Sequence, residues 1–368
     1  MVGYRVHGER AEVAITPTRF LAVLPDVSVR AEPSATLLNT AGGRGSVGVS
    51  VVLRNHRPEA AAGSVRYELP RGWRSDPAEH AFHLDARGTV TTVHFDLQPP
   101  KDAPCGDYRI AVAASGEGWR SNRSVRTIEY DHIGRTYVVA PSEVRVVAFP
   151  WAVDPVRVGY VASGFDSVPE FLEQMGFNVT LLGHEDLLLG DLAAFDTIVL
   201  GVYAYRSRPD LVAANQRLLR YVEDGGHLVV QLHRPGDNWD PDTVPPYRLV
   251  IGQPSFNWRI TDESAPVTVL QPNHRLFNAP NRISESDWGG WRKDRGLYFP
   301  MEWATEYQPL LSMSDPGWEP MQGGMLLARY GKGTYLYTSL ILYYQLEQYV
   351  PGAFRLMANM VSYPAGDR

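Results

Sequence analysis

Residues 156–182 read VRVGYVASGFDSVPEFLEQMGFNVTLL, and this stretch decides the fold of the C-terminal half. Apart from Arg157, the run 156–162 is apolar, as expected of a strand buried on both faces, and 168–177 has the spacing of an amphipathic helix. A further apolar run follows at 178–182. Strand, helix and strand in this order predict a parallel βαβ unit.

The same alternation continues toward the C-terminus. FDTIVLGV (195–202) is typical of a buried strand, NQRLLRYVEDGG (215–226) of a helix that stops at two glycines, and HLVVQL (227–232) of the next strand. We therefore predict that residues 151–368 form an α/β domain with an open, mostly parallel sheet and helices on both faces.

Residues 26–150 follow a different pattern. Short runs such as SVGVSVVLRN (46–55), TVTTVHFDL (89–97) and SEVRVVAF (142–149) alternate apolar and polar residues between turn residues. One strand in about every ten residues, with no helical stretch, predicts an antiparallel β-sandwich of the immunoglobulin-like kind. Residues 1–25 also contain strand-like runs, which we assign to an N-terminal extension outside the sandwich.

The composition excludes several classes of function. Among 368 residues, 35 Lys and Arg against 41 Asp and Glu give a net charge of −6, which argues against nucleic-acid and membrane partners. The single cysteine, Cys105, excludes a disulfide framework and a cysteine-based zinc cage. No HExxH or His-Pro-Asp-Asp motif occurs, and no apolar run approaches the roughly 20 residues that span a bilayer. We expect neither a metal nor a cofactor.

The sequence leaves the localisation open. MVGYRVHGERAEV (1–13) lacks the basic-then-apolar order of an export signal, and one cysteine suits either compartment. An extracytoplasmic location is expected if the chain is a fragment of a longer secreted protein, and a cytoplasmic one otherwise.

Residues 247–318 concentrate aromatic and charged side chains, including five of the nine tryptophans. Sugar rings require aromatic platforms for their apolar faces and charged groups for their hydroxyls. The alternative is a loop-rich segment that buries its tryptophans as core, and composition does not separate the two. The residues concerned are Trp258, Glu263, His274, Glu285, Asp287, Trp288, Trp291, Arg292, Asp294, Arg295, Glu302, Trp303 and Trp318.

Long stretches of the C-terminal half match a known family in order and spacing. They include 158–182, FDTIVLGVYAYRSR (195–208), DWGGWRKDRGLYFP (287–300) and 330–362. Through them, residues 156–362 resemble the C-terminal region of large bacterial PIG-L (LmbE-like) family deacetylases. The region looks like a class I glutamine amidotransferase-like domain of the flavodoxin-like type. Its NHRLF and ISESDW segments are also similar to ThuA-like sugar-utilisation proteins.

The resemblance implies glycans as the ligand class and a PIG-L-type deacetylase domain as a partner. It does not imply deacetylase activity for these residues, because the zinc deacetylase signature is missing from this chain. The amidotransferase nucleophile is missing too: we expect it after strand 227–232, where Gln231, Leu232 and His233 stand instead of Cys or Ser. Where the family reads GVRAYN, this chain reads GVYAYR, so Tyr203 replaces an arginine.

Three short strings carry a second resemblance in the first half. They are Leu69-Pro70-Arg71-Gly72-Trp73, Pro99-Pro100 and Gly106-Asp107-Tyr108. This half looks like the immunoglobulin-like module associated with α-galactosidases and other glycan enzymes.

These features together predict a non-catalytic module that binds a glycan or sugar derivative or supports assembly. One alternative is a hydrolase or isomerase of a sugar derivative, with His274 and either Glu285 or Asp287 as acid and base. Another is an oligomerisation platform built by the α/β domain, which is compatible with a homo-oligomer.

We place the ligand at the edge of the sheet. In open α/β sheets ligands bind outside the carboxyl ends of the strands, and the long insert leaves the predicted sheet at that edge. We expect one pocket there, in which arginines pair with carboxylates because unpaired buried guanidinium groups are costly. Its predicted ligand-binding residues are Asp166, Tyr205, Arg206, His233, His274, Asp287, Trp288, Arg292 and Arg295.

Overall fold

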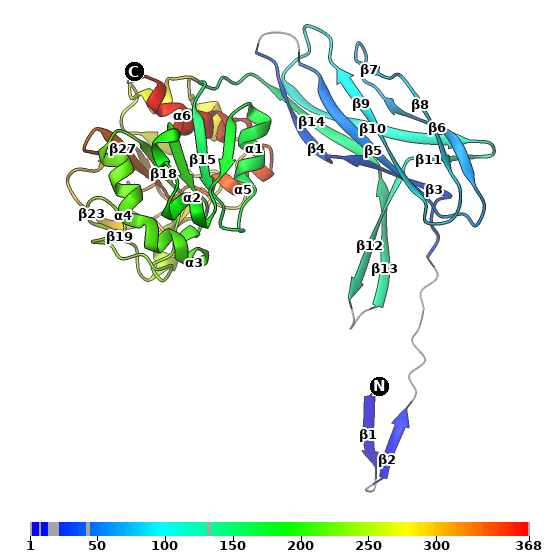
Figure 1. Ribbon diagram of the computed structural model, residues 1–368, viewed down its shortest axis with the longest axis horizontal. Helices are drawn as coiled ribbons and strands as arrows, with labels where there is room; N and C mark the ends of the chain where they lie inside the picture. Colours follow the sequence, from blue (N-terminus) through cyan, green and yellow to red (C-terminus); the bar gives the residue numbers. More distant parts are fainter. Residues whose placement is uncertain (1, 7–8, 14–21, 42–44, 131–133, 367–368) are drawn as a thin grey trace. The chain divides into compact units, whose positions relative to one another are not determined.

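The computed structural model describes residues 2–6, 9–13, 22–41, 45–130 and 134–366. The chain divides into two compact units (Figure 1). The first ends at Ala148 and the second begins at Phe149, with residues 39–42 belonging to the second. Within the described residues, no helix combines the length and the apolar character needed to cross a bilayer.

The first unit contains a β-sandwich of two sheets. The first sheet has the order β4 (Ala35–Asn39), β14 (Glu143–Phe149), β10 (Gly106–Gly116), β6 (Ala61–Glu68) and β8 (His80–Leu84), and β11 (Trp119–Ser121) pairs with β10. The second has the order β3 (Val27–Glu32), β5 (Val47–Asn55), β9 (Val90–Gln98) and β7 (Arg74–Asp76). Neighbouring strands are antiparallel throughout the second sheet, and from β14 to β8 in the first.

The alternating pattern of the sequence builds the core of this sandwich. In β5, Val47, Val49, Val51 and Leu53 are all buried, because successive side chains of a strand point to opposite faces. They pack in one cluster with side chains of both sheets. The prediction of a β-sandwich is therefore confirmed.

The string from Leu69 to Trp73 forms the crossover between the two sheets, from β6 to β7. Trp73 is buried, and its ring centre lies 5.1 Å from that of Tyr108. Gly72 adopts a φ of +85°, and a Cβ built on it would lie 3.4 Å from Pro100. These residues therefore hold the two sheets together.

We expect Gly72→Ala to lower the free energy of unfolding of the sandwich by about 1–2 kcal/mol, because a residue with a Cβ is strained at this φ. Gly106→Ala is the matched control, since Gly106 has no positive φ and its added Cβ meets no heavy atom within 4 Å. Urea unfolding followed by tryptophan fluorescence measures both variants. Equal losses in the two would contradict this role of Gly72.

Two hairpins lie outside the sandwich sheets. β1 (Val2–Val6) pairs antiparallel with β2 (Glu9–Val13), within the predicted N-terminal extension. β12 (Arg123–Tyr130) pairs antiparallel with β13 (Gly134–Pro141). The sequence analysis noted strand-like runs within residues 1–25 but named no strand at 123–141, and it predicted neither hairpin.

The second unit is built on a seven-stranded sheet. Figure 1 labels β15, β18 and β27 of this sheet and shows helices around them. The strand order is β16 (Asn178–Leu181), β15 (Arg157–Val161), β17 (Thr197–Leu200), β18 (His227–Val230), β27 (Gly333–Thr338), β26 (Met325–Tyr330) and β24 (Gln308–Pro309). The first five of these strands are parallel to one another. β26 pairs antiparallel with both β27 and β24.

Helices cover both faces of this sheet. Ile198 and Leu200 of β17 pack in one cluster with α4, whereas Thr197 donates a hydrogen bond of 2.8 Å to the carbonyl of Val361 in α6. Since alternate residues of a strand face opposite ways, α4 and α6 lie on opposite faces. The helices are α1 (Val168–Met175), α2 (His184–Leu188), α3 (Ala204–Ser207), α4 (Pro209–Glu223), α5 (Leu342–Glu347) and α6 (Pro351–Ser362), with a 3₁₀ turn η1 (Leu192–Ala194).

Between β18 and β26 the chain forms a long insert of short elements. Three two-stranded ladders pair β19 with β23, β20 with β22 and β21 with β25. The strands are β19 (Leu249–Ile251), β20 (Arg259–Ile260), β21 (Val267–Val269), β22 (Gly296–Leu297), β23 (Pro300–Trp303) and β25 (Leu311–Met313). The 3₁₀ helices are η2 (Ser255–Asn257), η3 (Arg275–Phe277) and η4 (Glu285–Trp288), and η5 (Tyr363–Gly366) follows α6.

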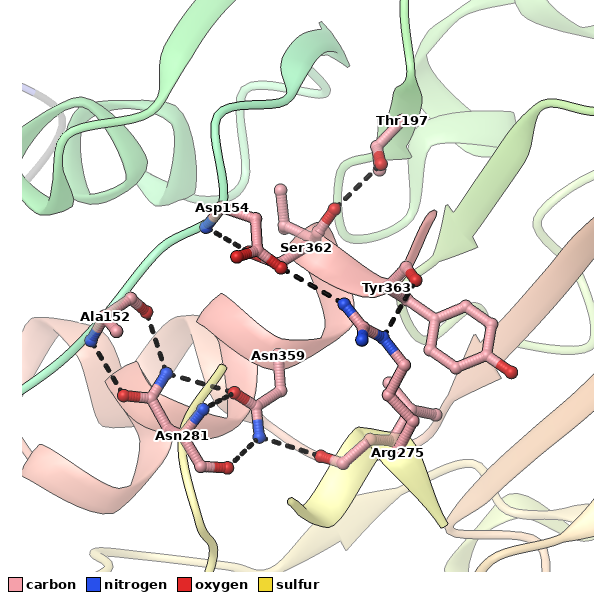
Figure 2. Close-up of polar contacts among 10 residues, drawn as sticks. Ala152, Asp154, Thr197, Arg275, Asn281, Asn359, Ser362 and Tyr363 are labelled. Carbon is pink, nitrogen blue, oxygen red and sulfur yellow. Dashed lines mark hydrogen bonds and ion pairs between the residues drawn. The ribbon is translucent and has the colours of Figure 1, made fainter. Parts of the chain in front are cut away.

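A buried amide pair fastens the insert to α6 (Figure 2). The Asn359 Oδ1 accepts from the main-chain N–H of Asn281 (2.8 Å) and from its Nδ2 (3.0 Å). The Asn359 Nδ2 donates to the carbonyls of Leu276 (2.9 Å) and Asn281 (2.7 Å). Asn281 in turn exchanges two hydrogen bonds of 2.8 Å with the main chain of Ala152. The segment entering β15, the insert and α6 are thereby joined.

Candidate functional site

Four of the nine predicted site residues lie at the carboxyl edge of the parallel sheet. Asp166 follows β15, Tyr205 and Arg206 follow β17, and His233 follows β18. The Asp166 Oδ2 accepts from the main-chain N–H of Val202 at 2.8 Å, and the His233 Nε2 accepts from that of Tyr205 at 3.1 Å. These hydrogen bonds bring the loops after the three strands together.

The carboxylate of Asp166 fills the space between the loops after β15 and β17. Its Oδ1 accepts from the Tyr160 hydroxyl at 2.5 Å and from the Val168 N–H at 3.2 Å. The Gln231 Nε2 donates to the same hydroxyl at 3.0 Å. Burial raises the pKa of Asp166. The chain therefore uses this carboxylate to join two of its own loops.

His233 is fully buried rather than a polar residue at an open strand end. Its Nδ1 lies 2.7 Å from the carbonyl of Gln231 and donates to it, while its Nε2 accepts, so these partners assign the neutral ring. The rings of Tyr205 and Trp239 lie 5.3 and 5.4 Å away. Burial lowers the pKa of His233 to about 4. His233 is thus a neutral core residue near pH 7.

The strained strand-to-helix turn follows β17, not β18 as the sequence analysis expected. Tyr203, with a φ of 57°, precedes α3, whereas a loop without a helix follows β18. Arg234 lies over the Tyr203 ring, 4.8 Å from its centre. Burial raises the pKa of the Tyr203 hydroxyl, which keeps the phenol protonated and poorly nucleophilic. This turn therefore presents Tyr203 where the sequence analysis looked for Cys or Ser at 231–233.

Arg206, beside this turn, has an exposed side chain. Its guanidinium lies 5.9 Å from the ring centre of Phe165, which is also exposed. Its predicted carboxylate partner is replaced by an aromatic ring.

His274 lies away from these residues. Its Nδ1 accepts from the N–H of Leu276 at 3.3 Å and so caps η3. Its ring stacks on Tyr363 at 5.8 Å, and Tyr363 in turn contacts His227, the first residue of β18. His274 thus lies toward the amino ends of the strands, opposite to the edge where we predicted it.

Asp287 is committed to structure. It is 3% exposed, forms an ion pair with Arg355 of α6, and accepts from the N–H and hydroxyl of Ser284 at 2.8 and 2.9 Å. A carboxylate held in this way is not available as a base. The nine predicted residues therefore do not converge on one pocket. The part of the insert that carries His274 and Asp287 packs along α6, whereas Tyr298 of the insert lies at the sheet edge, 6.1 Å from the ring centre of Tyr203.

The remaining three predicted residues, Trp288, Arg292 and Arg295, line one cavity of about 760 Å³. Apolar side chains from β21 and Ile283 and the edges of two tryptophans form part of its wall, and charged groups line the rest. We call it the insert cavity and define it by Glu263, Val267, Val269, Glu285, Trp288, Trp291, Arg292 and Arg295.

Local structure fixes the residues of the insert cavity. Ser284 and Asp287 form a capping box that begins η4, which places Glu285 and Trp288. The Trp291 Nε1 donates to the carbonyl of Asp287 at 3.1 Å, and the two indole rings lie 5.7 Å apart. Both tryptophans are buried, as the core alternative of the sequence analysis expects, and both also line the insert cavity, as a binding role requires.

The two arginines of the insert cavity differ in their partners. The Arg292 Nη1 lies 3.9 Å from the Glu263 Oε1, on the exposed side. Arg295 is 4% exposed and donates to the carbonyls of Ala265 (3.0 Å) and Trp288 (2.5 Å). In the described part of the chain no carboxylate lies within ion-pair distance of Arg295, so the expected pairing is wrong for this residue. Burial lowers its pKa.

Across the described ranges, no group of three or more His, Cys, Asp or Glu side chains is arranged to hold a metal ion. The charged groups of the insert cavity are accordingly two arginines and two glutamates. Such a set can accept from and donate to the hydroxyls of a polar ligand.

Comparison with known families assigns part of the first half. Residues 40–116 match the family described as NPCBM-associated, NEW3 domain of alpha-galactosidase. The matched range contains the strings 69–73, 99–100 and 106–108, so the resemblance of the first half is confirmed. No curated protein matches the chain.

Several solved structures show a low similarity to this chain. Cytoplasmic protein STM3548 from Salmonella typhimurium is 12% identical over 66% of this chain and 96% of its own, with a TM-score of 0.39. Cytoplasmic protein STM1381 from Salmonella typhimurium LT2 is 14% identical over 56% and 98%, with a TM-score of 0.38. A cold-adapted β-galactosidase from Rahnella is 14% identical over 54% and 32%, with a TM-score of 0.33. Likenesses at this level carry no conclusion about function.

Proposed function

We propose that this protein is a non-catalytic carbohydrate-binding module that serves a glycan-processing enzyme. The observation that carries the proposal is the match of residues 40–116 to a domain of α-galactosidase, which is an accessory domain of glycoside hydrolases. Of the strings that carry the resemblance, 69–73 builds the crossover between the two sheets, and Pro100 and Tyr108 lie against it.

The insert cavity supports binding of a sugar ring. Its volume of about 760 Å³ lies in the range of roughly 300–1,000 Å³ usual for small-molecule sites. Apolar walls at Val267 and Val269 suit the C–H face of a sugar, while Glu263, Glu285 and Arg292 can bind hydroxyls.

The described side chains favour binding over catalysis. His274 caps η3, and Asp287 is held by Arg355 and Ser284, so these two members of the enzyme alternative are engaged elsewhere. The third, Glu285, lines the insert cavity, but His274 does not. The strained turn after β17 carries Tyr203, whose protonated phenol is a poor nucleophile. The lining of the insert cavity thus lacks the histidine of the proposed acid–base pair.

The finer relation to PIG-L deacetylases is part of the proposal. The sheet order β16-β15-β17-β18-β27 is compatible with the flavodoxin-like arrangement of amidotransferase-like domains, in which the order reverses beside the first strand. On this view the protein presents a glycan to a PIG-L-type deacetylase domain. Light scattering tests the remaining alternative, a homo-oligomeric platform, which a strictly monomeric chain would exclude.

The test of carbohydrate binding is calorimetric titration of the full chain with neutral and acidic oligosaccharides. We expect binding, and we expect Val267→Trp, which fills the insert cavity, to weaken it about ten-fold or more. Val212→Trp on the exposed side of α4 is the matched control and should bind as the wild type does. Binding that survives Val267→Trp would move the site elsewhere. A folded protein that binds no sugar of the panel would refute the proposed function.

A further inference from the structure

The guanidinium of Arg295 has an unusual environment. It is 96% buried in the wall of the insert cavity, and its Nε and Nη1 donate to the carbonyls of Ala265 and Trp288. Its carbon Cζ lies 5.4 Å from the ring centre of Trp291. Among the described residues, Nη2 has no hydrogen-bond partner. A full positive charge is therefore buried against neutral groups.

Two of the neighbouring carboxylates, Asp262 and Glu263, are engaged with other groups, and Glu285 lies exposed in the wall of the insert cavity. The Asp262 Oδ1 accepts from the N–H and hydroxyl of Ser264 at 2.8 and 2.6 Å. The Glu263 Oε2 accepts from the N–H of Lys293 at 2.5 Å, and its Oε1 lies 3.9 Å from Arg292. Both acids raise the pKa of Arg295 from a distance, but burial outweighs them.

This arrangement is costly unless a ligand completes it. Burying a charge without a counter-ion loses its hydration, and two carbonyls return only part of that loss. A neutral donor could satisfy the carbonyls of Ala265 and Trp288 at lower cost. An anionic group entering the insert cavity would pair with Arg295 where little water competes, which makes the interaction strong.

We propose that the insert cavity binds an acidic sugar residue, whose carboxylate pairs with the buried guanidinium of Arg295. This inference rests on the proposed function and names its ligand class. A carboxylate suits the planar guanidinium, which can donate from two N–H groups at once. Arg292, held only loosely by Glu263 at 3.9 Å, supplies a second cation at the open side.

The preference for an acidic sugar is tested by calorimetric titration of the full chain. The titrants are galacturonic acid trimers, their methyl esters, neutral galactose trimers and sodium sulfate. We expect the acid to bind about ten-fold more tightly than the ester. The advantage should persist at an ionic strength of about 0.15 M, because the buried Arg295 is poorly screened.

Three variants locate the effect. Arg295→Gln keeps a donor for the carbonyls and should lose most of the preference for the acid over the ester, since only the exposed Arg292 remains. Glu263→Gln removes the competing carboxylate and should strengthen acid binding about three-fold. Arg248→Gln is the control, since Arg248 pairs on the surface with Asp242 and Glu302, and its affinities should not change.

The outcomes separate the two proposals. If the ester and the neutral trimer bind as tightly as the acid, the inference fails while carbohydrate binding stands. If no trimer binds to the folded protein, the proposed function fails as well. Sulfate that displaces the acid at equal concentration would show a simple anion site and overturn the sugar assignment. Should Arg295→Gln not fold, weaker acid binding by Glu263→Gln would still refute the inference.

Discussion

Replacing Asn359 by alanine is expected to lower the free energy of unfolding of the α/β unit by about 3–4 kcal/mol. The amide is fully buried and makes four hydrogen bonds of 2.7–3.0 Å. Its loss leaves the carbonyls of Leu276 and Asn281 and the N–H of Asn281 without this partner, and it also leaves a small cavity. Each unsatisfied buried group costs about 1–3 kcal/mol, so the total loss of stability exceeds that caused by removing an exposed hydrogen bond.

Asn278→Ala is the matched control for this prediction. The Asn278 Nδ2 also donates to two carbonyls, those of Pro272 (2.8 Å) and His274 (2.9 Å), but these hydrogen bonds are exposed. Water can replace them, and we expect a loss below about 1 kcal/mol. Urea unfolding monitored by circular dichroism compares the two variants. Similar losses would show that the amide pair of Figure 2 does not fasten the insert.

Local pattern in the sequence was sufficient for the regular parts of the fold. In β5 the alternation of valines marks one buried face, and β17 and β18 are buried on both faces as continuous apolar runs. The Asn281–Asn359 pair could not be predicted in this way, because its members are 78 residues apart and each is an ordinary polar residue in its own segment. Such long-range pairs decide where the irregular insert lies.

In the candidate site, too, local sequence predicted the positions of some residues but not their long-range contacts. Trp288, Arg292 and Arg295 were predicted together and do line one cavity, since they are close in the sequence and share the turns around η4. Asp166 and His233 were placed at the correct strand ends, but sequence could not show that burial and internal hydrogen bonds occupy them. The expected pairing of Arg295 failed because backbone carbonyls took the place of a carboxylate.

The second large effect is a loss of stability in acid that depends on His233. Burial lowers the pKa of His233 to about 4, against about 6.5 in an unfolded chain. Between these values the unfolded chain binds the proton and the native one does not, so stability rises with pH across this window. The contribution is fully present near pH 7 and is lost as the pH falls toward 4. Its size is about 3 kcal/mol.

Other groups titrate in the same range, so the test compares variants. Burial raises the pKa of Asp166, which gives a contribution of opposite sign, while His274 adds one of the same sign because burial lowers its pKa. His233→Gln removes only the His233 contribution, and its urea midpoint should approach that of the wild type as the pH falls from about 7 to 4. His184→Gln, which changes an exposed histidine of the same unit, should follow the wild-type curve. If the urea midpoints of the wild type and His233→Gln fall in parallel over this range, His233 takes up its proton as readily in the native state as in the unfolded chain. Its assignment as a buried residue with a lowered pKa would then be wrong.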